Sequence, residues 1–353
     1  MDKYGIDNHK LIYHIPRVNK WLQGINIYPI YIEIGLYGGC NHRCIFCAFG
    51  LLEYKPSTLD TRYLKDFILE AAAMGVKSVL YSGEGEPLLH KDVADIIVFT
   101  KKSGIDVALA TNGVMFDKDK ANRLLRHLSW LKFSLDASCD KTYALIHGTR
   151  KDDFNIVMRN IKEAVKIRNR YNHNCTIGVQ FLLLPQNCRE VKALAKIMGN
   201  IGVDYLVIKP YSQHRLNIKI QHGFNYNKFF YLEKEMGRYE RNGFQIIFRR
   251  HAMEKLGENK PYRHCLALPF ATCISTEGDM FPCNYFLGKK EFAFGNIYKE
   301  NFKKIWNGKK RKKVMGFIYN KLDTESCRRA CRLDNINRYL WELKNPNSHV
   351  NFI

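Results

Sequence analysis

The first 211 residues alternate between apolar segments with a strand pattern and segments with a helix pattern, and this alternation constrains the fold more than any other feature. A helical segment follows each of the first five strand-like segments. This order predicts a parallel sheet with right-handed crossovers, and six such strands can curl into an open barrel. We therefore expect an α/β fold, an incomplete (β/α)6 TIM-like barrel. The predicted strands span 31–37, 79–83, 107–113, 131–137, 176–184 and 205–211.

The helices between these strands are predicted from apolar residues that recur three or four positions apart. In the first helix, Leu64, Phe67 and Ile68 have this spacing. Ala71 continues the pattern, and Gly75 follows as a natural helix end. The other helices are predicted near 91–103, 117–128, 153–169 and 188–200.

The alternation stops after residue 211, which predicts a change of domain. We expect an N-terminal extension, the barrel, a connecting region with a helix near 226–241, and a small cysteine-rich domain that ends in a helix near 335–344. The expected domain bounds are 1–30, 31–211, 212–262 and 263–353.

The chain has 11 cysteines but no sequence feature of export. No apolar run approaches the roughly 18 residues that a membrane span needs. The first 15 residues mix charged and apolar side chains, unlike a signal peptide. We therefore expect a cytoplasmic protein with no membrane partner. In such a protein, cysteines indicate metal binding or catalysis more than disulfides.

The net charge of +22, from 56 Lys and Arg against 34 Asp and Glu, favours an anionic partner or reflects a lysine-rich surface. Nucleic acid, a membrane surface and a phosphorylated small molecule are all anionic. The chain has no recognised nucleic-acid-binding motif, and the basic run 309–313 is typical of a solvated helix face. We favour an anionic or sugar-linked small molecule over nucleic acid.

Cys40, Cys44 and Cys47 form a C-x3-C-x2-C pattern directly after the first predicted strand. Three thiolates on one loop can hold three irons of a 4Fe–4S cluster and leave the fourth iron open for another ligand. Structural zinc is the alternative, but zinc prefers four closed ligands. No fourth cysteine lies nearby, and His42 is badly placed to bind the same ion.

This loop, with Phe46 just before its third cysteine, resembles that of the radical S-adenosylmethionine (SAM) enzymes, and the resemblance extends from residue 31 to about 211. Segments 82–89, 111–113 and 134–137 resemble later motifs of the family, each at the end of a predicted strand, where ligands of parallel α/β folds bind. Glu84 replaces a glycine of the family pattern. The resemblance implies that SAM is bound by Phe46, Gly83, Glu84, Gly85, Glu86, Pro87, Asn112, Ser134 and Asp136.

The resemblance also implies roles for these residues and the chemistry of the site. Glu86 would accept hydrogen bonds from the SAM ammonium, Phe46 would pack on the adenine, and Ser134 and Asp136 would contact the ribose. One electron from the cluster, supplied by a donor such as flavodoxin or ferredoxin, would cleave SAM into methionine and a 5′-deoxyadenosyl radical. That radical would take a hydrogen atom from a substrate C–H bond.

A second set of cysteines lies in the C-terminal region, and its spacing is similar to that of SPASM and twitch domains, which carry auxiliary clusters. Five cysteines after residue 260 suffice for one auxiliary 4Fe–4S cluster but not for two, which favours a twitch domain. Zinc on four thiolates remains the alternative. Four protein ligands leave no open iron, so this cluster would transfer an electron or tune the site. The four expected ligands are Cys265, Cys283, Cys327 and Cys331.

The remaining cysteines are most simply small apolar residues. Cys188 follows the fifth predicted strand by a short loop, so its thiol could return a hydrogen atom to a product radical. Cys273 is a weaker candidate for this role. The other two are Cys139 and Cys175.

These features predict a radical SAM oxidoreductase or epimerase that abstracts a hydrogen atom from an anionic, sugar-like small molecule. Twitch-type relatives include an aminocyclitol dehydrogenase. The first alternative is epimerisation or crosslinking of a ribosomally made peptide, although only about 30 residues precede the first strand, too few for a leader-binding domain. The second alternative is a non-catalytic iron–sulfur or zinc protein that binds nucleic acid through its charge.

Overall fold

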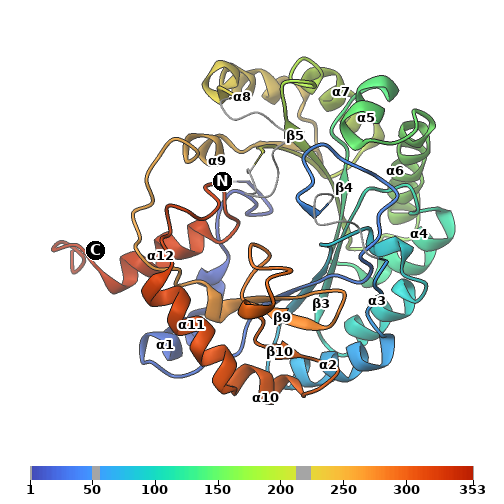
Figure 1. The fold of residues 1–353 in the computed structure, drawn as a ribbon. Coiled ribbons are helices and arrows are strands. Elements are labelled where there is room, and N and C mark those ends of the chain that lie inside the picture. Colours follow the sequence, from blue (N-terminus) through green and yellow to red (C-terminus); the bar gives the residue numbers. More distant parts are fainter. Residues whose placement is uncertain (1, 50–55, 212–223, 353) are drawn as a thin grey trace.

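A computed structural model describes residues 2–49, 56–211 and 224–352, in which all ten strands belong to one sheet (Figure 1). The strand order is β10-β9-β8-β1-β2-β3-β4-β5-β6-β7. Neighbours from β8 through β1 to β7 are parallel, whereas β9 and β10 join antiparallel. The strands are β1 (Tyr31–Ile34), β2 (Ser78–Tyr81), β3 (Asp106–Thr111), β4 (Trp130–Ser134), β5 (Thr176–Leu183), β6 (Tyr205–Pro210), β7 (Gln245–Phe248), β8 (Ala271–Ile274), β9 (Asp279–Phe281) and β10 (Gly295–Asn296).

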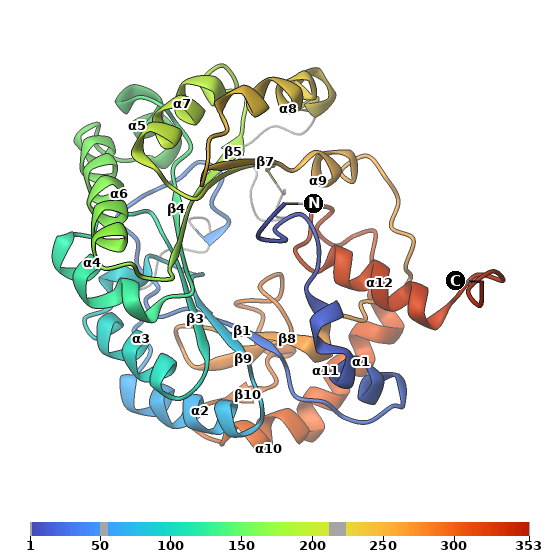
Figure 2. The ribbon, with the colours of Figure 1, turned by 180° about the vertical axis from the view of Figure 1, so that it is seen from behind.

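The helices form an arc outside the curved sheet, as Figure 2 shows from behind. They cover the outer face, where the crossovers between parallel strands place them. The α-helices are α1 (Ile15–Leu22), α2 (Thr61–Ala73), α3 (Val93–Lys102), α4 (Lys118–Leu124), α5 (Asp140–His147), α6 (Asp152–Arg170), α7 (Val191–Ile201), α8 (Tyr231–Met236), α9 (Arg250–Glu254), α10 (Phe302–Asn307), α11 (Lys309–Lys321) and α12 (Asp334–Lys344).

The predicted barrel is confirmed, and helix α2 shows why the sequence pattern works. Its buried side chains include Leu64, Phe67 and Ile68, as the spacing predicts. The carboxylate of Asp60 accepts a hydrogen bond from a first-turn backbone N–H, which caps the helix. Gly75 adopts a φ of 82°, which a residue with a side chain rarely does.

Between β1 and α8, helix α5 was absent from the prediction, strand β7 follows α8 without having been predicted, and one predicted helix is broken. Helix α5 has only eight residues, too few for a clear apolar period. Strand β7 has four residues inside the expected connecting region, where it extends the sheet parallel to β6. The helix expected near 226–241 divides into α8 and two flanking 3-10 turns.

The C-terminal region continues the same sheet. Strand β8 pairs in parallel with β1 on the side opposite β2, so eight parallel strands follow one another where the alternation predicts six. The sequence order could not show this pairing, because β8 follows β1 by more than 200 residues.

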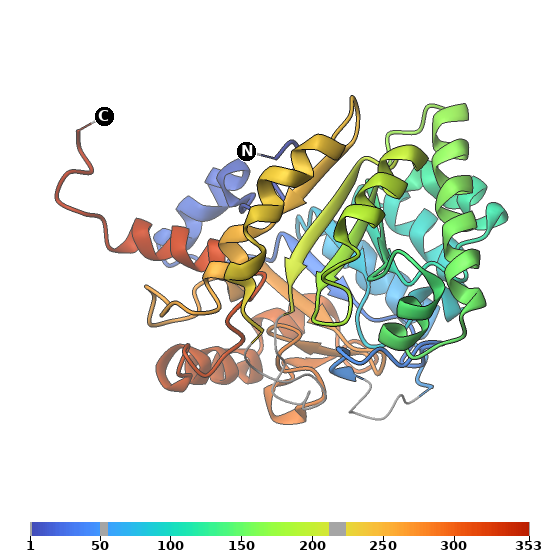
Figure 3. The ribbon, with the colours of Figure 1, turned by 90° about the horizontal axis from the view of Figure 1, so that it is seen from above.

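The two ends of the chain also meet. Val18 of α1 belongs to a small apolar core that includes Leu340 of α12 and Phe270. Figure 3 shows α12 leading into a C-terminal segment that extends away from the body of the molecule. None of the helices in the described part of the chain combines the length and apolarity needed to cross a lipid bilayer.

Candidate functional site

The loop of Cys40, Cys44 and Cys47 leaves the carboxyl end of β1 and is held by backbone hydrogen bonds to α5. The amide of Arg43 donates to the carbonyl of His147 at 2.8 Å, and that of Ile45 donates to Ile146 at 2.9 Å. Helix α5, which the sequence analysis did not predict, therefore positions the cysteine loop.

The predicted cofactor segments meet at one cavity of about 170 Å³. The ends of β1, β2, β3 and β4 contribute to it, which is the arrangement that a parallel α/β sheet predicts for a ligand site. Pro87 and Asp136 do not line this cavity. Its lining residues are Cys40, His42, Cys44, Phe46, Cys47, Ser82, Gly83, Glu84, Gly85, Glu86, Ala110, Thr111, Asn112, Ser134 and His147.

The three thiols lie close enough to influence one another. Burial, with a smaller contribution from neighbouring groups that include Cys47, raises the pKa of Cys40 to about 11. Burial also raises the pKa of Cys44 well above its usual value, and Cys47 and Cys40 add to this effect. Buried thiols that disfavour one another's ionisation are suited to a shared cationic centre, which would stabilise all three thiolates. The donor set therefore fits an iron–sulfur cluster.

Glycine is required where the loops after β1 and β2 touch. A Cβ at Gly85 would lie 2.2 Å from the carbonyl oxygen of Gly39 and 2.3 Å from that of Tyr37. The amide of Glu86 donates to the same Gly39 oxygen at 2.9 Å. This close contact fixes the segment before Cys40 against the segment that was expected to bind SAM.

Glu86 already has several partners within the chain. Its carboxylate accepts hydrogen bonds from Leu88 N at 3.0 Å, Thr111 Oγ1 at 2.7 Å and Asn112 N at 2.8 Å. The side chain is almost fully buried, and burial raises its pKa. Glu86 therefore ties the ends of β2 and β3 together, and its expected contact with the SAM ammonium stays a prediction.

Glu84 lines the cavity but directs its carboxylate to the C-terminal region. Its Oε2 accepts a hydrogen bond from Thr276 N at 2.6 Å. The amide of Asn112 reaches the cysteine loop through Asn41 Oδ1 at 2.7 Å. Glu84, the residue that departs from the family pattern, thus connects the segment after β2 to the β8–β9 hairpin.

Asp136 lies behind the cysteine loop, where it faces His147 instead of a ribose site. Its carboxylate is fully buried, accepts a hydrogen bond from Leu182 N at 2.6 Å and has one oxygen 3.4 Å from His147 Nε2. Burial raises its pKa to about 7. Asp136 does not line the smaller cavity, so the structure lends no support to its expected ribose contact, which stays a prediction.

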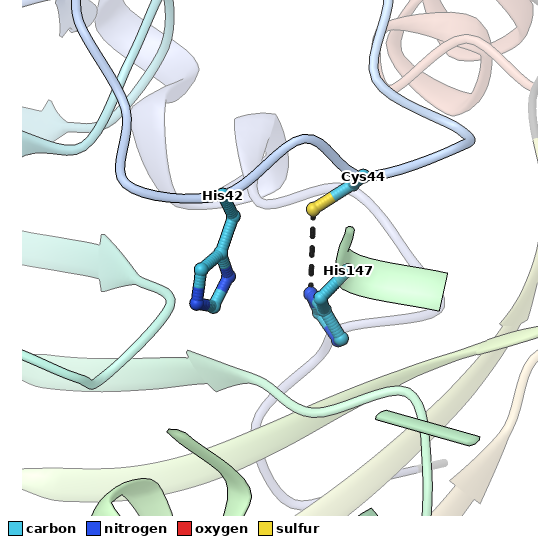
Figure 4. A group of neighbouring side chains, drawn as sticks. All are labelled: His42, Cys44 and His147. Atoms are coloured by element: carbon cyan, nitrogen blue, oxygen red, sulfur yellow. Dashed lines mark hydrogen bonds between the residues drawn. The ribbon is translucent and has the colours of Figure 1, made fainter. Parts of the chain in front are cut away.

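His147 links this buried carboxylate to a cluster ligand. Its Nδ1 lies 3.3 Å from Cys44 Sγ, and Figure 4 shows the thiol and the ring facing one another. The backbone N–H of Asp136 lies 3.4 Å from Nε2 and donates to it when the ring proton is on Nδ1. In that tautomer His147 donates a hydrogen bond to the sulfur of Cys44.

A competing metal site would use the imidazoles of His42 and His147 together with Cys44. Their donor atoms lie within 4.8 Å of one another, which within the described residues is the one such group of histidine, cysteine and carboxylate side chains. Two imidazoles and a thiolate are suitable zinc ligands. Both sites need the sulfur of Cys44, so metal analysis distinguishes them.

A second, larger cavity of about 490 Å³ lies beside the first. The two cavities share Phe46, Cys47 and Ser134 among their lining residues. All four cysteines of the expected auxiliary cluster also line the larger cavity: Cys265, Cys283, Cys327 and Cys331. One cavity thus extends from the barrel cysteine loop to the C-terminal cysteines.

The C-terminal thiols form a close set. Burial, reinforced by Cys331 and then Cys327, raises the pKa of Cys265 to about 12. Burial likewise raises the pKa of Cys283, with Cys331, Cys265 and Cys327 contributing. Four mutually close thiols from three chain segments fit one four-ligand cluster, and equally a structural zinc ion.

The remaining candidate cysteines differ in whether they line a cavity. Cys188 lines neither cavity, and its thiol faces the carbonyl of Pro185 at 3.5 Å. The structure therefore does not support Cys188 as a hydrogen donor to a substrate. Cys273 is almost fully buried and lines the larger cavity.

Sequence reasoning missed the charged residues on the inner face of the barrel. Lys132 of β4 and Lys209 of β6 line the larger cavity, together with Arg249. Strand alternation could have indicated this position. Lys132 lies between Leu131 and Phe133, which are fully buried and face the helices, so its own side chain points to the opposite, inner face of the barrel.

Two family models match the chain. Residues 34–198 match the radical SAM superfamily, and residues 265–332 match the SPASM iron–sulfur cluster-binding domain. The predicted resemblance is confirmed. With it, the 4Fe–4S cluster, the auxiliary cluster and SAM are established as the cofactors of this kind of chain.

Relatives share the architecture at low identity. The Pyrococcus furiosus tungsten-containing aldehyde ferredoxin oxidoreductase cofactor-modifying protein is 22% identical over 85% of this chain and 88% of that protein. The AdoMet-dependent heme synthase of Methanosarcina barkeri is 24% identical over 79% of this chain and 82% of its own length. Fe-coproporphyrin III synthase from the same organism is 26% identical over 56% of this chain, which spans only 46% of that relative.

Solved structures show the same fold. Streptococcus suis SuiB bound to S-adenosylmethionine has a TM-score of 0.69, with 18% identity over 95% of this chain and 79% of SuiB. Native anSMEcpe with bound AdoMet has a TM-score of 0.58, with 15% identity over 89% of this chain and 95% of that chain.

Proposed function

Because the chain belongs to the radical SAM superfamily and carries a SPASM iron–sulfur domain, we propose that it oxidises a small anionic molecule by removing a hydrogen atom from one C–H bond. The observation that carries this proposal is the cavity of about 490 Å³ whose lining reaches from Cys47 to all four C-terminal cysteines. A substrate there would lie between the site of radical formation and a possible electron acceptor.

Cys40, Cys44 and Cys47 would hold the SAM-binding cluster, and the C-terminal set would hold the auxiliary one. When bound, these cofactors would supply the electron that cleaves SAM, the 5′-deoxyadenosyl radical that takes a hydrogen atom, and an acceptor for one further electron. The substrate would thus lose a hydrogen atom, a proton and an electron, which makes the product two hydrogens lighter. A one-electron donor such as flavodoxin or ferredoxin would reduce the SAM-binding cluster.

The chain's own residues would orient the substrate and exclude water. Phe46 packs against His147 with ring centroids 5.9 Å apart, and it lines both cavities. It would therefore lie between SAM in the smaller cavity and the substrate in the larger one. The size of the cavity is typical of a small-molecule site, about 300–1,000 Å³. The names of the sequence relatives, a heme synthase and a cofactor-modifying protein, also support a small-molecule substrate.

Oxidation is favoured over epimerisation by the position of the thiols. An epimerase needs a hydrogen donor on the face opposite the abstraction, and Cys188 does not reach either cavity. Cys273 is the remaining donor candidate, since it lines the larger cavity. Its thiol faces the carbonyl of Phe281 at 3.8 Å, within the β8–β9 pair.

Peptide modification is the second candidate, and the titles of structural relatives motivate it. SuiB has been solved bound to the precursor peptide SuiA, and anSMEcpe has been solved with peptides. These relatives are at most 18% identical to this chain, so their likeness concerns the fold. A nucleic-acid-binding role without catalysis is the third candidate and predicts no SAM cleavage.

The test presents the anaerobically reconstituted enzyme with SAM, a reductant and fractionated anionic metabolites or, separately, peptides. We expect an anionic metabolite to raise 5′-deoxyadenosine formation above the background and to yield a product two hydrogens lighter. Turnover in D2O should leave no deuterium on the product carbon. A product of the same constitution that carries one deuterium, lost in Cys273→Ala, would instead establish epimerisation. Stimulation by peptides alone would establish the second candidate.

A further inference from the structure

Two lysines on the inner face of the barrel have no hydrogen-bond or ion-pair partner among the described residues. Lys132 of β4 and Lys209 of β6 are partly buried and line the larger cavity. Among the described residues, neither ammonium group forms a hydrogen bond or an ion pair, although Lys132 lies 5.5 Å from the centre of the Trp130 ring. A buried ammonium without a counter-charge is unfavourable, so such groups are retained where a ligand completes them.

The other charged groups facing this part of the cavity are paired. Arg332 forms an ion pair with Glu33 on β1 at 2.5 Å. Arg249, directly after β7, pairs with Asp7 at 2.9 Å. These two carboxylates are therefore engaged. The remaining carboxylate that acts on Lys209 is Asp136, whose own pKa of about 7 leaves it only partly ionised at neutral pH, so it offsets the positive charge of the two lysines incompletely.

The lysines influence each other as neighbouring like charges do. Burial lowers the pKa of Lys209 well below its usual value, and Lys132, Arg249 and Arg332 lower it further, whereas Asp136 opposes the shift. Burial also lowers the pKa of Lys132 to about 8, with Arg332 and Arg249 adding to the effect and Glu33 opposing it. An anion between the two groups would reverse this unfavourable interaction.

We propose that Lys132 and Lys209 form an anion subsite that binds a phosphate or carboxylate group of the substrate. This inference rests on the proposed function and specifies its substrate class. Lys132 lies two residues before Ser134 on the same face of β4, and Ser134 lines both cavities. The subsite would hold the charged end of the substrate deeper in the barrel, so that the other end faces the SAM cavity.

The subsite is separate from the SAM cavity. Neither lysine lines the smaller cavity, in which the three barrel cysteines and the predicted SAM segments meet. The lysines come from β4 and β6 and are not among the residues expected to hold SAM or either cluster. Their charge is therefore available to the substrate.

The test titrates the holoenzyme, with both clusters in place, with inorganic phosphate and separately with malonate. Sodium chloride at the same ionic strength serves as the control. We expect one anion per chain at neutral pH, and at least about tenfold weaker binding in Lys132→Met or Lys209→Met, since each removes one charged partner. The exposed Lys166→Met on α6 is the matched control and should bind like the parent. Phosphate or malonate, whichever binds tighter, indicates the group on the substrate.

A pH series adds a readout that a structural lysine would not give. Lys132 is charged below its pKa of about 8, so binding should weaken as the pH rises from 7 to 9.5. The bound anion should itself raise this pKa, which shifts the loss to higher pH. The methionine variants should melt at a higher temperature than the parent without anion, because a buried charge has been removed. A lysine that only supports the fold would lower the melting temperature.

Several results would overturn the proposal. These are no anion binding by the parent, equal binding by the parent and the double variant, or loss of SAM affinity with unchanged anion binding. If a methionine variant loses iron, Lys132→Gln and Lys209→Gln replace it in the same titration. Formation of 5′-deoxyadenosine by the parent is measured in parallel, so that failure of the subsite is distinguished from failure of the proposed radical chemistry.

Discussion

His147 contacts three other parts of the site: an expected cluster ligand, a buried carboxylate and an aromatic ring. Its Nδ1 faces Cys44, its Nε2 faces Asp136, and its ring packs on Tyr143 with centroids 4.3 Å apart. A hydrogen bond to a ligand sulfur stabilises the more negative, reduced state of a cluster. His147 is therefore a positioning residue that would set how readily the SAM-binding cluster accepts an electron.

Substitution His147→Leu should make the reduction potential of this cluster more negative. The loss of roughly 1 kcal/mol of differential stabilisation corresponds to about 40 mV for one electron. Redox titration followed by electron paramagnetic resonance measures the shift, and His147→Gln, which can still donate a hydrogen bond, should recover part of it. An unchanged or less negative potential in His147→Leu would contradict the assigned hydrogen bond.

Cys44→Ala should lower the iron content from about eight to about four per chain, as expected when one of two cubanes is lost. The matched control is Cys139→Ala, because Cys139 lies outside both cavities. Metal analysis of the purified, reconstituted proteins is the measurement. One equivalent of zinc with four irons in the parent would instead assign zinc to one of the cysteine sets.

Cys283→Ala should block product formation while 5′-deoxyadenosine still forms in the absence of substrate. The reason is that the radical would form at the barrel cysteines, whereas Cys283 belongs to the C-terminal set. Both compounds are quantified from the same reaction. Normal turnover by this variant would show that the C-terminal site is only structural.

At the residue scale, the sequence predicted which residues form the site better than it predicted the partners of their side chains. The seven cysteines were predicted because thiolate spacing is a direct chemical signal, and the structure gathers them into two sets. The contacts of Glu86 and Asp136 were not predictable, because they depend on how the ends of β2, β3 and β4 turn. Lys132 was predictable from strand alternation but was overlooked.

At the scale of elements, the cysteine loop depends on close backbone packing against the segment after β2. Gly85→Ala would place a methyl group 2.2 Å from the Gly39 oxygen, and a backbone atom cannot move aside cheaply. We expect destabilisation by about 3 kcal/mol or more, with loss of iron from the barrel site. Chemical denaturation and iron analysis measure the two effects.

Gly237→Ala is the matched control for this change. Gly237 has a negative φ of −53° and open space around the position of a Cβ. Its substitution should leave stability equal or slightly higher, because alanine restricts the unfolded chain. Equal effects of the two substitutions would contradict the packing argument.

Two of the elements that the sequence missed, α5 and β7, share a physical cause. Helix α5 and strand β7 are short, so neither repeats an apolar period often enough to be recognised. Both matter for the site: α5 braces the cysteine loop, and β7 leads directly into Arg249 at the edge of the larger cavity. Long elements such as α2 and α6 were predicted because several turns contribute to one pattern.

At the scale of the whole molecule, the barrel and the cysteine-rich region share one sheet. Strand β1, whose Ile32 and Ile34 are fully buried, lies between β2 and β8. The carboxylate of Glu84, after β2, also accepts a hydrogen bond from the backbone N–H of Thr276, between β8 and β9. The C-terminal region therefore completes the barrel edge in addition to providing cysteines.

A chain truncated after residue 262 should fail to give a stable soluble monomer. Removal of β8 would expose the apolar edge strand β1, which is prone to pair with other chains. Size-exclusion chromatography of the truncated and full-length proteins tests this. A monomeric truncated protein that holds about four irons would show that the barrel is independent of the C-terminal region.

Radical cleavage of SAM at the barrel cysteines is the chemistry proposed for these two cavities, and formation of 5′-deoxyadenosine tests it most directly. The anaerobically reconstituted full-length protein, given SAM and dithionite, should convert SAM into methionine and 5′-deoxyadenosine in equal amounts. Cys40→Ala, Cys44→Ala and Cys47→Ala should each abolish both products. A protein that holds about four or more irons and binds SAM, yet forms no 5′-deoxyadenosine under reducing conditions, would contradict the proposed radical chemistry.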